Sequence, residues 1–261
     1  MKNILYTCLF LFCCFSMAGK VPTKQKQRLT ENWEYLKGDL GGIWEAVRPF
    51  SPGNPESVPI WQKVTLPHCF NAEDAVDPDI NYYQGPGWYK TQLTIDNPYA
   101  GGRVVLDFEG AGQKTKVYIY TTLVGEHVGG YDEWSVDITE AVKNFMADDK
   151  LMKRFKGKVP LSIRCDNSRD VEMIPSDLSD FNLYGGLYRY LNLVYLPKAS
   201  FEQIRLEPEL SANRKEGTVK VKASFYNPED IRKADVTVTI YDAGHQQIYS
   251  QTVENILPLG D

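Results

Sequence analysis

Tyr188-Arg-Tyr-Leu-Asn-Leu-Val-Tyr195 indicates the fold most clearly, because aromatic and aliphatic residues make up most of it. Residues of these types are enriched in β-strands, where they pack on a pleated surface. Further runs of this kind are separated by glycine, proline, asparagine and aspartate, at Trp88–Ile95, Arg103–Glu109, Lys116–Tyr120, Pro160–Cys165 and Leu187–Leu196. Many short strands separated by turns predict an all-β fold, either a sandwich or a jelly roll.

Residues Thr139–Ala147 form the one predicted helix, with Thr139 as the N-cap and Glu140 in the first turn. The basic run that follows, Lys150–Lys158, is predicted to be a solvated loop rather than a phosphate site. An oxygen-rich stretch resembles a calcium loop only loosely, because it lacks the ordered ligand spacing and the turn glycine; it contains Asp74, Asp77 and Asp79. No metal site and no cofactor are therefore predicted.

The composition excludes several classes of protein. The chain has 261 residues, of which 43% are hydrophobic, and its 29 Lys and Arg against 34 Asp and Glu give a net charge of −5. A nucleic-acid partner is not expected, because phosphate contacts usually require a basic excess. Collagen-like and disordered classes do not fit this apolar content. The length allows one to two domains.

Residues 1–18 resemble a secretory signal peptide. Lys2 is followed by the apolar run Ile4–Phe15, and Ser16 and Ala18 provide small residues at the −3 and −1 positions of a cleavage site. The run is shorter than the ~20 residues that span a bilayer. We expect a secreted or periplasmic protein with no membrane association after cleavage; an uncleaved anchor is the alternative.

Cleavage at this point would leave two cysteines, Cys69 and Cys165. They could form one disulfide, although two buried small hydrophobic residues are the favoured interpretation. A zinc site is not expected, because the chain has no Cys-x-x-Cys pair and only three histidines, His68, His127 and His245.

A domain boundary is predicted near Leu196–Ala199. Beyond it, three segments alternate apolar and polar residues at Gly217–Phe225, Ala234–Tyr241 and Gln247–Val253. Such alternation indicates strands with one buried face. Three or four strands match the beginning of an immunoglobulin-like sandwich, which needs about seven strands and ~100 residues. We therefore expect a jelly-roll domain over 19–198 and an incomplete immunoglobulin-like sandwich over 199–261.

Five short motifs occur in order along the first of these domains. They are Trp61-Gln-Lys-Val-Thr-Leu-Pro-His68, Tyr83-Gln-Gly-Pro-Gly-Trp-Tyr89, Phe108-Glu-Gly110 with Val117-Tyr118, Val124-Gly-Glu-His-Val-Gly-Gly-Tyr131, and Asp166-Asn167 with Asp180-Phe-Asn-Leu-Tyr-Gly-Gly-Leu-Tyr-Arg189. Each motif alone is weak. Together, in this order and spacing, they closely resemble the N-terminal sugar-binding domain of glycoside hydrolase family 2, the family of β-galactosidases, β-glucuronidases and β-mannosidases.

The resemblance covers roughly Arg28 to Pro197, and the residues after it resemble the start of the family's immunoglobulin-like domain. One turn departs from the family pattern, because Tyr120-Thr-Thr-Leu123 replaces the usual Asn-Gly. Asn-Gly suits a type I′ hairpin, so we expect a turn of another type here.

The resemblance implies a fold and a division of labour. In this family both catalytic carboxyl groups lie on a (β/α)8 barrel that follows the immunoglobulin-like domain. Such a barrel takes about 250 residues and does not fit in the remaining sequence. No catalytic residue is therefore expected here, and the acidic residues Glu73, Asp74, Glu133 and Asp177 are interpreted as solvated loop or turn residues.

Three residues are candidates for substrate binding. The resemblance implies that Asp180 lies on a loop that reaches the mouth of the active site and contacts a sugar hydroxyl, a task suited to a carboxylate acceptor. Gln84 matches a position from which some relatives send a polar group into the same pocket. Asn167 resembles a family marker at the end of a strand, and its side chain is expected to hold a loop in place.

The remaining motif residues have structural interpretations. His68 and His127 are expected to be hydrogen-bonding residues, and Gly185 and Gly186 to permit a close backbone approach. Core or interface positions, rather than a sugar platform, are expected for Trp88, Tyr89, Tyr188 and Arg189.

The sequence thus predicts the N-terminal part of an exported retaining β-glycosidase of the β-galactosidase type. Its partners would be a terminal β-linked sugar and a C-terminal barrel of the parent enzyme. This part alone is expected to be inactive. The alternatives are a free-standing carbohydrate-binding module and a structural or assembly protein that keeps the fold.

Overall fold

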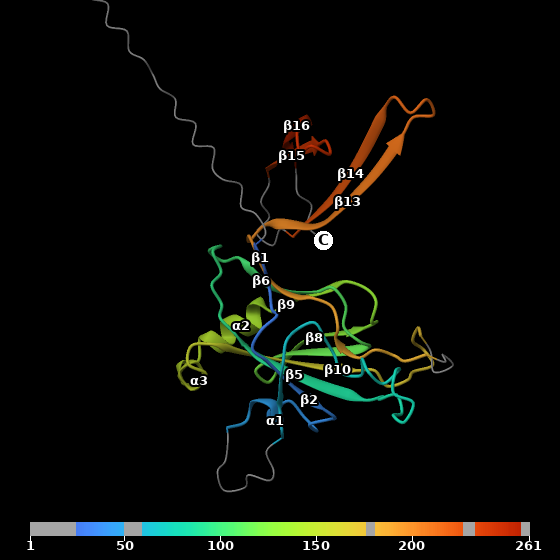
Figure 1. Cartoon of the computed structure of the whole chain (residues 1–261). Coiled ribbons are helices and arrows are strands. Elements are labelled where there is room, and N and C mark those ends of the chain that lie inside the picture. The colour runs from blue at the N-terminus through green and yellow to red at the C-terminus, as the bar shows by residue number, and fades with distance from the viewer. Residues whose placement is uncertain (1–24, 50–58, 176–180, 227–232, 257–261) are drawn as a thin grey trace, which may run out of the picture.

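The computed structural model describes residues 25–49, 59–175, 181–226 and 233–256. Two antiparallel sheets pack face to face in a β-sandwich of the jelly-roll type, as predicted (Figure 1). The larger sheet has six strands in the order β3 (Gln62–Val64), β2 (Trp33–Lys37), β5 (Pro86–Leu93), β10 (Val159–Asp166), β7 (Lys114–Ile119) and β8 (Thr122–Val128). The smaller sheet has four strands in the order β1 (Gln25–Arg28), β12 (Leu191–Leu196), β6 (Arg103–Phe108) and β9 (Trp134–Asp137).

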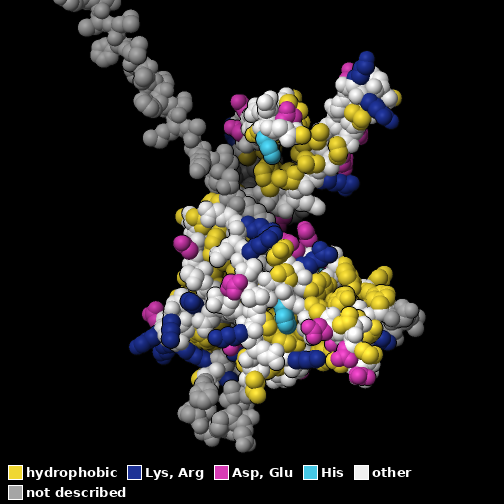
Figure 2. All heavy atoms as spheres, viewed as in Figure 1, with side chains coloured by type: hydrophobic (Ala, Val, Ile, Leu, Met, Phe, Trp, Pro, Cys, Tyr) yellow, Lys and Arg dark blue, Asp and Glu magenta, His cyan; other side chains and the backbone are white. Residues whose placement is uncertain are grey.

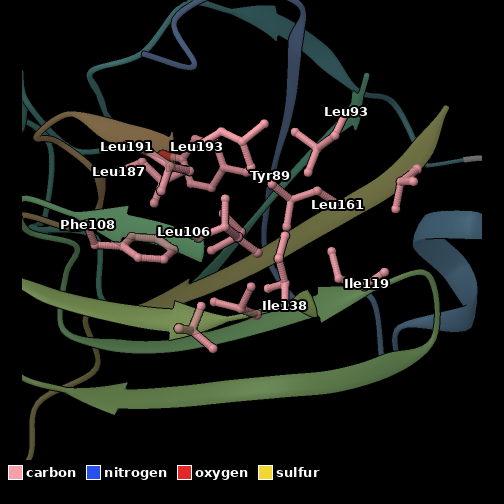
Figure 3. Close-up of a cluster of buried hydrophobic side chains, with 14 of the residues drawn as sticks. Tyr89, Leu93, Leu106, Phe108, Ile119, Ile138, Leu161, Leu187, Leu191 and Leu193 are labelled. Carbon is pink, nitrogen blue, oxygen red and sulfur yellow. The ribbon is translucent and has the colours of Figure 1, made fainter. Parts of the chain in front are cut away.

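The core lies between the two sheets. On β10, the inward-facing Leu161, Ile163 and Cys165 are fully buried. Leu106 and Leu193 enter the same cluster from the smaller sheet, as Figure 3 shows. Burying a large aliphatic side chain contributes about 1.5–3 kcal/mol, so this cluster is the main source of the sandwich's stability.

The outer face of the larger sheet is also partly covered. Trp88 is buried there and stacks on Tyr118 at 5.8 Å between ring centroids. The short helix α1 (Trp44–Val47) buries Ala46 and Val47. The outer face of this sheet is therefore not uniformly exposed to solvent.

The predicted helix is confirmed as α2 (Thr139–Met146), but Thr139 is not its N-cap. Ile138 occupies the cap position and makes no side-chain hydrogen bond. Asp137 Oδ1 instead accepts a hydrogen bond from the Thr139 backbone N–H at 2.9 Å. The Thr139 hydroxyl is turned toward β6, where it accepts from the Val104 N–H at 2.9 Å.

The prediction of a loop over Lys150–Lys158 is wrong in part, because helix α3 covers Asp149–Arg154. Asp148 caps this helix: its Oδ1 accepts from the backbone N–H groups of Lys150 at 2.9 Å and Leu151 at 3.0 Å. A carboxylate at the N-cap satisfies donors that the first turn leaves free. The basic side chains of the run are largely exposed, as expected.

The predicted strand Leu187–Leu196 is two strands. β11 (Gly186–Leu187) pairs with β4 (His68–Cys69), whereas β12 pairs with β1 and β6. The change of partner accounts for the break between them. The β7–β8 hairpin has Tyr120 with a φ of 53° as the first residue of its two-residue loop, and Thr121 has no positive φ. A type I′ turn needs positive φ at both positions, so the expected departure is confirmed.

After residue 199 the chain forms two antiparallel hairpins. β13 (Ser200–Leu210) pairs with β14 (Gly217–Tyr226), and β15 (Ala234–Tyr241) pairs with β16 (Gln247–Ile256). No helix in the described ranges is long and apolar enough to cross a membrane. The predicted signal, residues 1–18, lies outside those ranges.

The two cysteines are free thiols, in agreement with the favoured prediction. Cys165 is buried on β10, and Cys69 is half-buried on β4. Burial raises the pKa of the Cys165 thiol to about 12, so this residue behaves as a small hydrophobic side chain.

Candidate functional site

Three buried asparagines hold the loops at one end of the sandwich together. They are Asn71, Asn167 and Asn182, and none is more than 5% exposed. Buried amides are stable only where their donors and acceptors are paired. The pairing of these three side chains therefore defines the local backbone geometry.

Asn167 follows β10 and fixes the loop that carries Gln84. Its Oδ1 accepts from the Gly85 N–H at 2.9 Å, and its Nδ2 donates to the Tyr83 carbonyl at 2.8 Å. These two groups flank Gln84 on either side. The second Nδ2 bond goes to the Leu183 carbonyl at 2.7 Å, so one side chain joins two loops.

Asn71 and Asn182 fix the second of these loops. Asn71 Nδ2 donates to Asn182 Oδ1 and to the Leu183 carbonyl, both at 2.8 Å. Asn71 Oδ1 accepts from the Gly185 N–H at 2.9 Å. Asn182 Nδ2 returns a bond to the Asn71 carbonyl at 3.0 Å. Residues 182–185 are thereby held against the segment that follows β4.

Gly185 and Gly186 allow this close approach, as predicted. A Cβ on Gly185 would lie 2.2 Å from Cζ of Phe70. Gly186 has a φ of +107°, and its Cβ would lie 2.3 Å from the Tyr89 hydroxyl. Any larger residue would push the Gly186–Cys69 pairing apart.

The expectation that Asp74 is a solvated loop residue is wrong. It is buried rather than solvated, and its Oδ2 accepts from the Tyr83 N–H at 2.6 Å. It therefore supports the Gln84 loop together with Asn167, because both side chains bond to the Tyr83 backbone. Glu73 and Glu133 are exposed, as expected, and Asp77 accepts from the Asp79 N–H at 3.0 Å within its own turn. Asp177 lies outside the described residues.

The two histidines of the motifs have structural partners. His68 Nδ1 lies 2.9 Å from the Tyr89 hydroxyl, and burial lowers the pKa of its imidazole. His127 stacks on Trp134 at 4.7 Å, and its Nε2 lies 3.2 Å from Asp132 Oδ1. Trp88 and Tyr89 are buried, as predicted, and no longer qualify as sugar platforms.

The structure places the three predicted substrate-binding residues in different surroundings. Gln84 is half-buried on its clamped loop. The amide oxygen and both amide hydrogens of Asn167 are engaged within the protein, so its role in the free chain is to hold loops. Asp180 lies outside the described residues, two positions before Asn182. A direct contact between any of them and a sugar stays a prediction.

An apolar rim surrounds the clamped loops, and sequence analysis did not identify it. Its side chains are between 38% and 90% exposed and come from three loops: Val76, Ile80, Tyr82, Val171, Ile174, Phe181 and Tyr184. Figure 2 shows hydrophobic side chains gathered at this end of the sandwich. Contiguous exposed apolar surface is typical of an interaction site. These loops have no periodic pattern, so only the fold brings them together.

The described residues contain no group of three or more His, Cys, Asp or Glu side chains that could hold a metal ion.

Residues 44–197 match the family described as the sugar-binding domain of the glycosyl hydrolases family 2. The chain belongs to glycoside hydrolase family 2. It is similar to the crystal structure of Parabacteroides merdae β-glucuronidase, with 75% sequence identity and a TM-score of 0.86 over 90% of this chain. Bacteroides uniformis β-glucuronidase 3 is 57% identical over 89% of this chain, with a TM-score of 0.82.

A curated relative carries the other family activity in its name: the β-galactosidase of Thermoanaerobacter pseudethanolicus is 32% identical over 162 residues, or 60% of this chain. The chain spans 30% of the length of the Parabacteroides protein and 19% of that of the Thermoanaerobacter protein. Residues 44–197 thus correspond to the sugar-binding domain of these longer relatives.

Proposed function

We propose that the chain is the N-terminal part of an exported, retaining β-glycosidase that acts on β-glucuronides. In this proposal, residues 19–198 supply one wall of the substrate pocket, and the catalytic carboxyl groups come from a part of the enzyme outside residues 1–261. A retaining mechanism needs two carboxyl groups about 5–5.5 Å apart, one as nucleophile and one as acid/base.

The clamped loop carries the proposal. Gln84 lies between two backbone groups that Asn167 holds at 2.9 and 2.8 Å, so the backbone on both sides of Gln84 is held before any ligand arrives. Pre-positioned polar groups bind a transition state without the cost of ordering them. The apolar rim around this loop supports a second element of the proposal, which is that the barrel-bearing part of the enzyme packs here and completes the pocket.

The choice of sugar rests on similarity alone. The 75% identity to a β-glucuronidase favours a glucuronide substrate over the galactoside that the motifs first suggested. The β-galactosidase relative at 32% identity keeps the galactoside as the second candidate. The proposed role of Asp180 and Gln84 is to accept and donate hydrogen bonds to hydroxyl groups of the bound sugar.

A chimera tests this proposal. Residues 1–261 replace the matching 30% of the Parabacteroides β-glucuronidase, and hydrolysis of nitrophenyl β-glucuronide and β-galactoside is compared. The proposal expects activity on the glucuronide, with retained configuration of the first product by NMR. Residues 1–261 alone should show none. Hydrolysis by the isolated chain, or a folded but inactive chimera, would contradict the proposal.

Export is tested separately. The proposal expects the chain, expressed in a bacterial host with a secretion pathway, to leave the cytoplasm with Gly19 as its first residue. N-terminal sequencing of the exported protein checks this. An unprocessed Met1 on the exported protein would instead support an uncleaved anchor.

Calorimetry with simple β-glycosides distinguishes the two non-enzymatic alternatives. A stand-alone carbohydrate-binding module gives a saturable signal with the isolated chain and an inactive chimera. A structural or assembly protein gives neither binding nor activity. The proposed enzyme part gives weak or no binding alone, because one wall of a pocket buries only a fraction of the ligand.

A further inference from the structure

An open groove of about 1240 Å³ lies on the larger sheet, away from the clamped loops. Its floor contains Glu34, Lys90 and Ser162, which are directly paired across β2, β5 and β10. These positions alternate with the core residues Tyr35, Tyr89 and Ile163. Since side chains on a strand alternate between faces, the floor of the groove is the outer face of the sheet.

The groove is separate from the site already described. The Lys90–Ser162 pair lies four residue pairs from the Pro86–Asp166 pair, beyond which Gln84 and Asn167 follow. At ~3.3 Å per residue, this separation is about 13 Å along the strands. A monosaccharide bound at the clamped loops would not reach Ser162.

Positive charge dominates the groove, although the whole chain carries −5. Five basic residues line it against two acidic ones: Arg48, Lys63, Lys90, Arg154 and Lys158 against Glu31 and Glu34. Within the described ranges, the ammonium groups of Lys63 and Lys158 have no ion pair or hydrogen bond. Figure 2 shows Lys and Arg side chains gathered over α3, next to this face. The groove therefore favours an anionic ligand.

The groups available to a ligand are those at the surface of the groove. Ser162 is 1% exposed and its hydroxyl is enclosed by the protein. Lys90 Nζ already lies 3.6 Å from Glu34 and 4.0 Å from the centre of the Trp61 ring. The exposed ammonium groups of Lys63 and Lys158 therefore remain to bind an anion.

We propose that this groove binds an anionic, uronate-bearing oligosaccharide, with carboxylates at Lys63 and Lys158. The groove exceeds the ~300–1,000 Å³ of ordinary small-molecule pockets, so it suits an extended chain of sugars. The choice of a carbohydrate rests on the proposed function, whereas the anionic character rests on the lining residues. Such a site would hold a polymeric substrate away from the point of cleavage.

Calorimetry on the full chain of 261 residues tests the proposal. The probe is a glucuronate-containing tetrasaccharide, and the control ligand is the same tetrasaccharide with its carboxylates reduced to alcohols. We expect saturable binding of the probe, binding at least about tenfold weaker for the reduced control, and weaker binding at high salt because exposed charges are screened.

A charge-matched pair of variants locates the site. The double substitution Lys63→Gln/Lys158→Gln should weaken binding about tenfold, since each exposed charge contact contributes a factor of a few. Lys150→Gln/Lys215→Gln removes the same charge from exposed positions outside the groove and should change binding less than about twofold.

Three results would overturn the proposal: no saturable binding of the probe, equal loss in the two double variants, or equal displacement by inorganic sulfate at matched ionic strength. Equal displacement by sulfate would show that the basic residues of the groove bind any anion. Failure of the proposed function would be seen in a different experiment, as loss of nitrophenyl glucuronide hydrolysis by the chimera. That substrate is a monosaccharide and does not extend to the groove, so its hydrolysis does not depend on binding there.

Discussion

The sandwich and the two C-terminal hairpins use the same strand pattern with opposite results for burial. On β10, Leu161 and Ile163 are 0% exposed, because the smaller sheet covers them. On β13, Leu206 is 61% exposed, although it also alternates with polar neighbours. Its partner across the hairpin is Val221. An alternating pattern therefore identifies a strand and its apolar face, but it does not identify what covers that face.

The polar faces of the hairpins carry paired polar side chains, as expected for amphipathic strands. On β13–β14, Lys220 lies 2.6 Å from Glu209, and Lys222 lies 3.1 Å from Glu207. On β15–β16, the Thr237 and Thr252 hydroxyls lie 2.8 Å apart.

The largest expected difference between the two regions is in core truncation. Leu161→Ala should lower the free energy of unfolding by about 3–5 kcal/mol, because it leaves a cavity in a closed core. Leu206→Ala in the hairpin should cost less than about 0.5 kcal/mol, since its side chain already contacts solvent. Urea unfolding of both variants measures the difference. Equal costs would mean that something covers the hairpin face in solution.

The asparagine clamp should have the next largest effect. Asn167→Ala removes the partners of Gly85, Tyr83 and Leu183, and it should cost about 2–4 kcal/mol. Asn144→Ala on the exposed face of α2 is the control and should cost less than about 0.5 kcal/mol. Hydrogen exchange at the Gly85 amide should quicken in the first variant. An unchanged Gly85 rate would show that Asn167 does not hold the loop.

Arg103 connects the sandwich to the first hairpin, and we expect a smaller free-energy effect from its removal. Its guanidinium donates to the Ser200 hydroxyl and the Glu202 carboxylate, both at 3.0 Å, and lies 3.6 Å from the centre of the Tyr226 ring. A double-mutant cycle of Arg103→Met and Tyr226→Leu should give a coupling of about 1–2 kcal/mol.

The exposed pair Lys220–Glu209 is the control cycle for Arg103, and its coupling should stay below about 0.5 kcal/mol. Equal couplings in the two cycles would remove Arg103 as the link between the sandwich and the hairpins.

The smallest expected effect is a pH dependence from His68. Burial lowers its pKa in the folded protein below the ~6.5 of an unfolded imidazole. The unfolded chain therefore binds more protons as the pH falls through this window, and stability declines on acidification. His68→Gln should flatten the stability profile between about pH 5 and 7, whereas His245→Asn in the β15–β16 turn should leave its shape unchanged. A profile unaffected by His68→Gln would contradict this assignment.

The sequence predicted the strands well because aromatic and β-branched runs such as Lys116–Tyr120 record local preference. Helix α3 was not predicted, because a basic run is typical of a solvated loop and the capping role of Asp148 depends on two backbone N–H groups rather than on charge. The burial of Asp74 was also not predicted, since nothing in the sequence reveals that the Tyr83 N–H lies opposite.

The sequence identified individual residues of the candidate site but not their arrangement in space. Gln84 and Asn167 were identified as separate motif positions, yet the clamp between them depends on a contact across 82 residues of sequence. The apolar rim and the charged groove come from loops and strand ends with no common pattern. Long-range packing creates these surfaces, so local sequence cannot specify them.

The central claim is that the clamped loop places Gln84 in the substrate pocket of a family 2 glycosidase. Steady-state hydrolysis of nitrophenyl β-glucuronide by the chimera tests it most directly, with Gln84→Ala compared with Gln92→Ala at the other end of β5. We predict a kcat/KM at least about tenfold lower for Gln84→Ala, the loss of one polar contact at about 1.4 kcal/mol per tenfold, and an unchanged value for Gln92→Ala. Equal kcat/KM values in the two variants would contradict the claim.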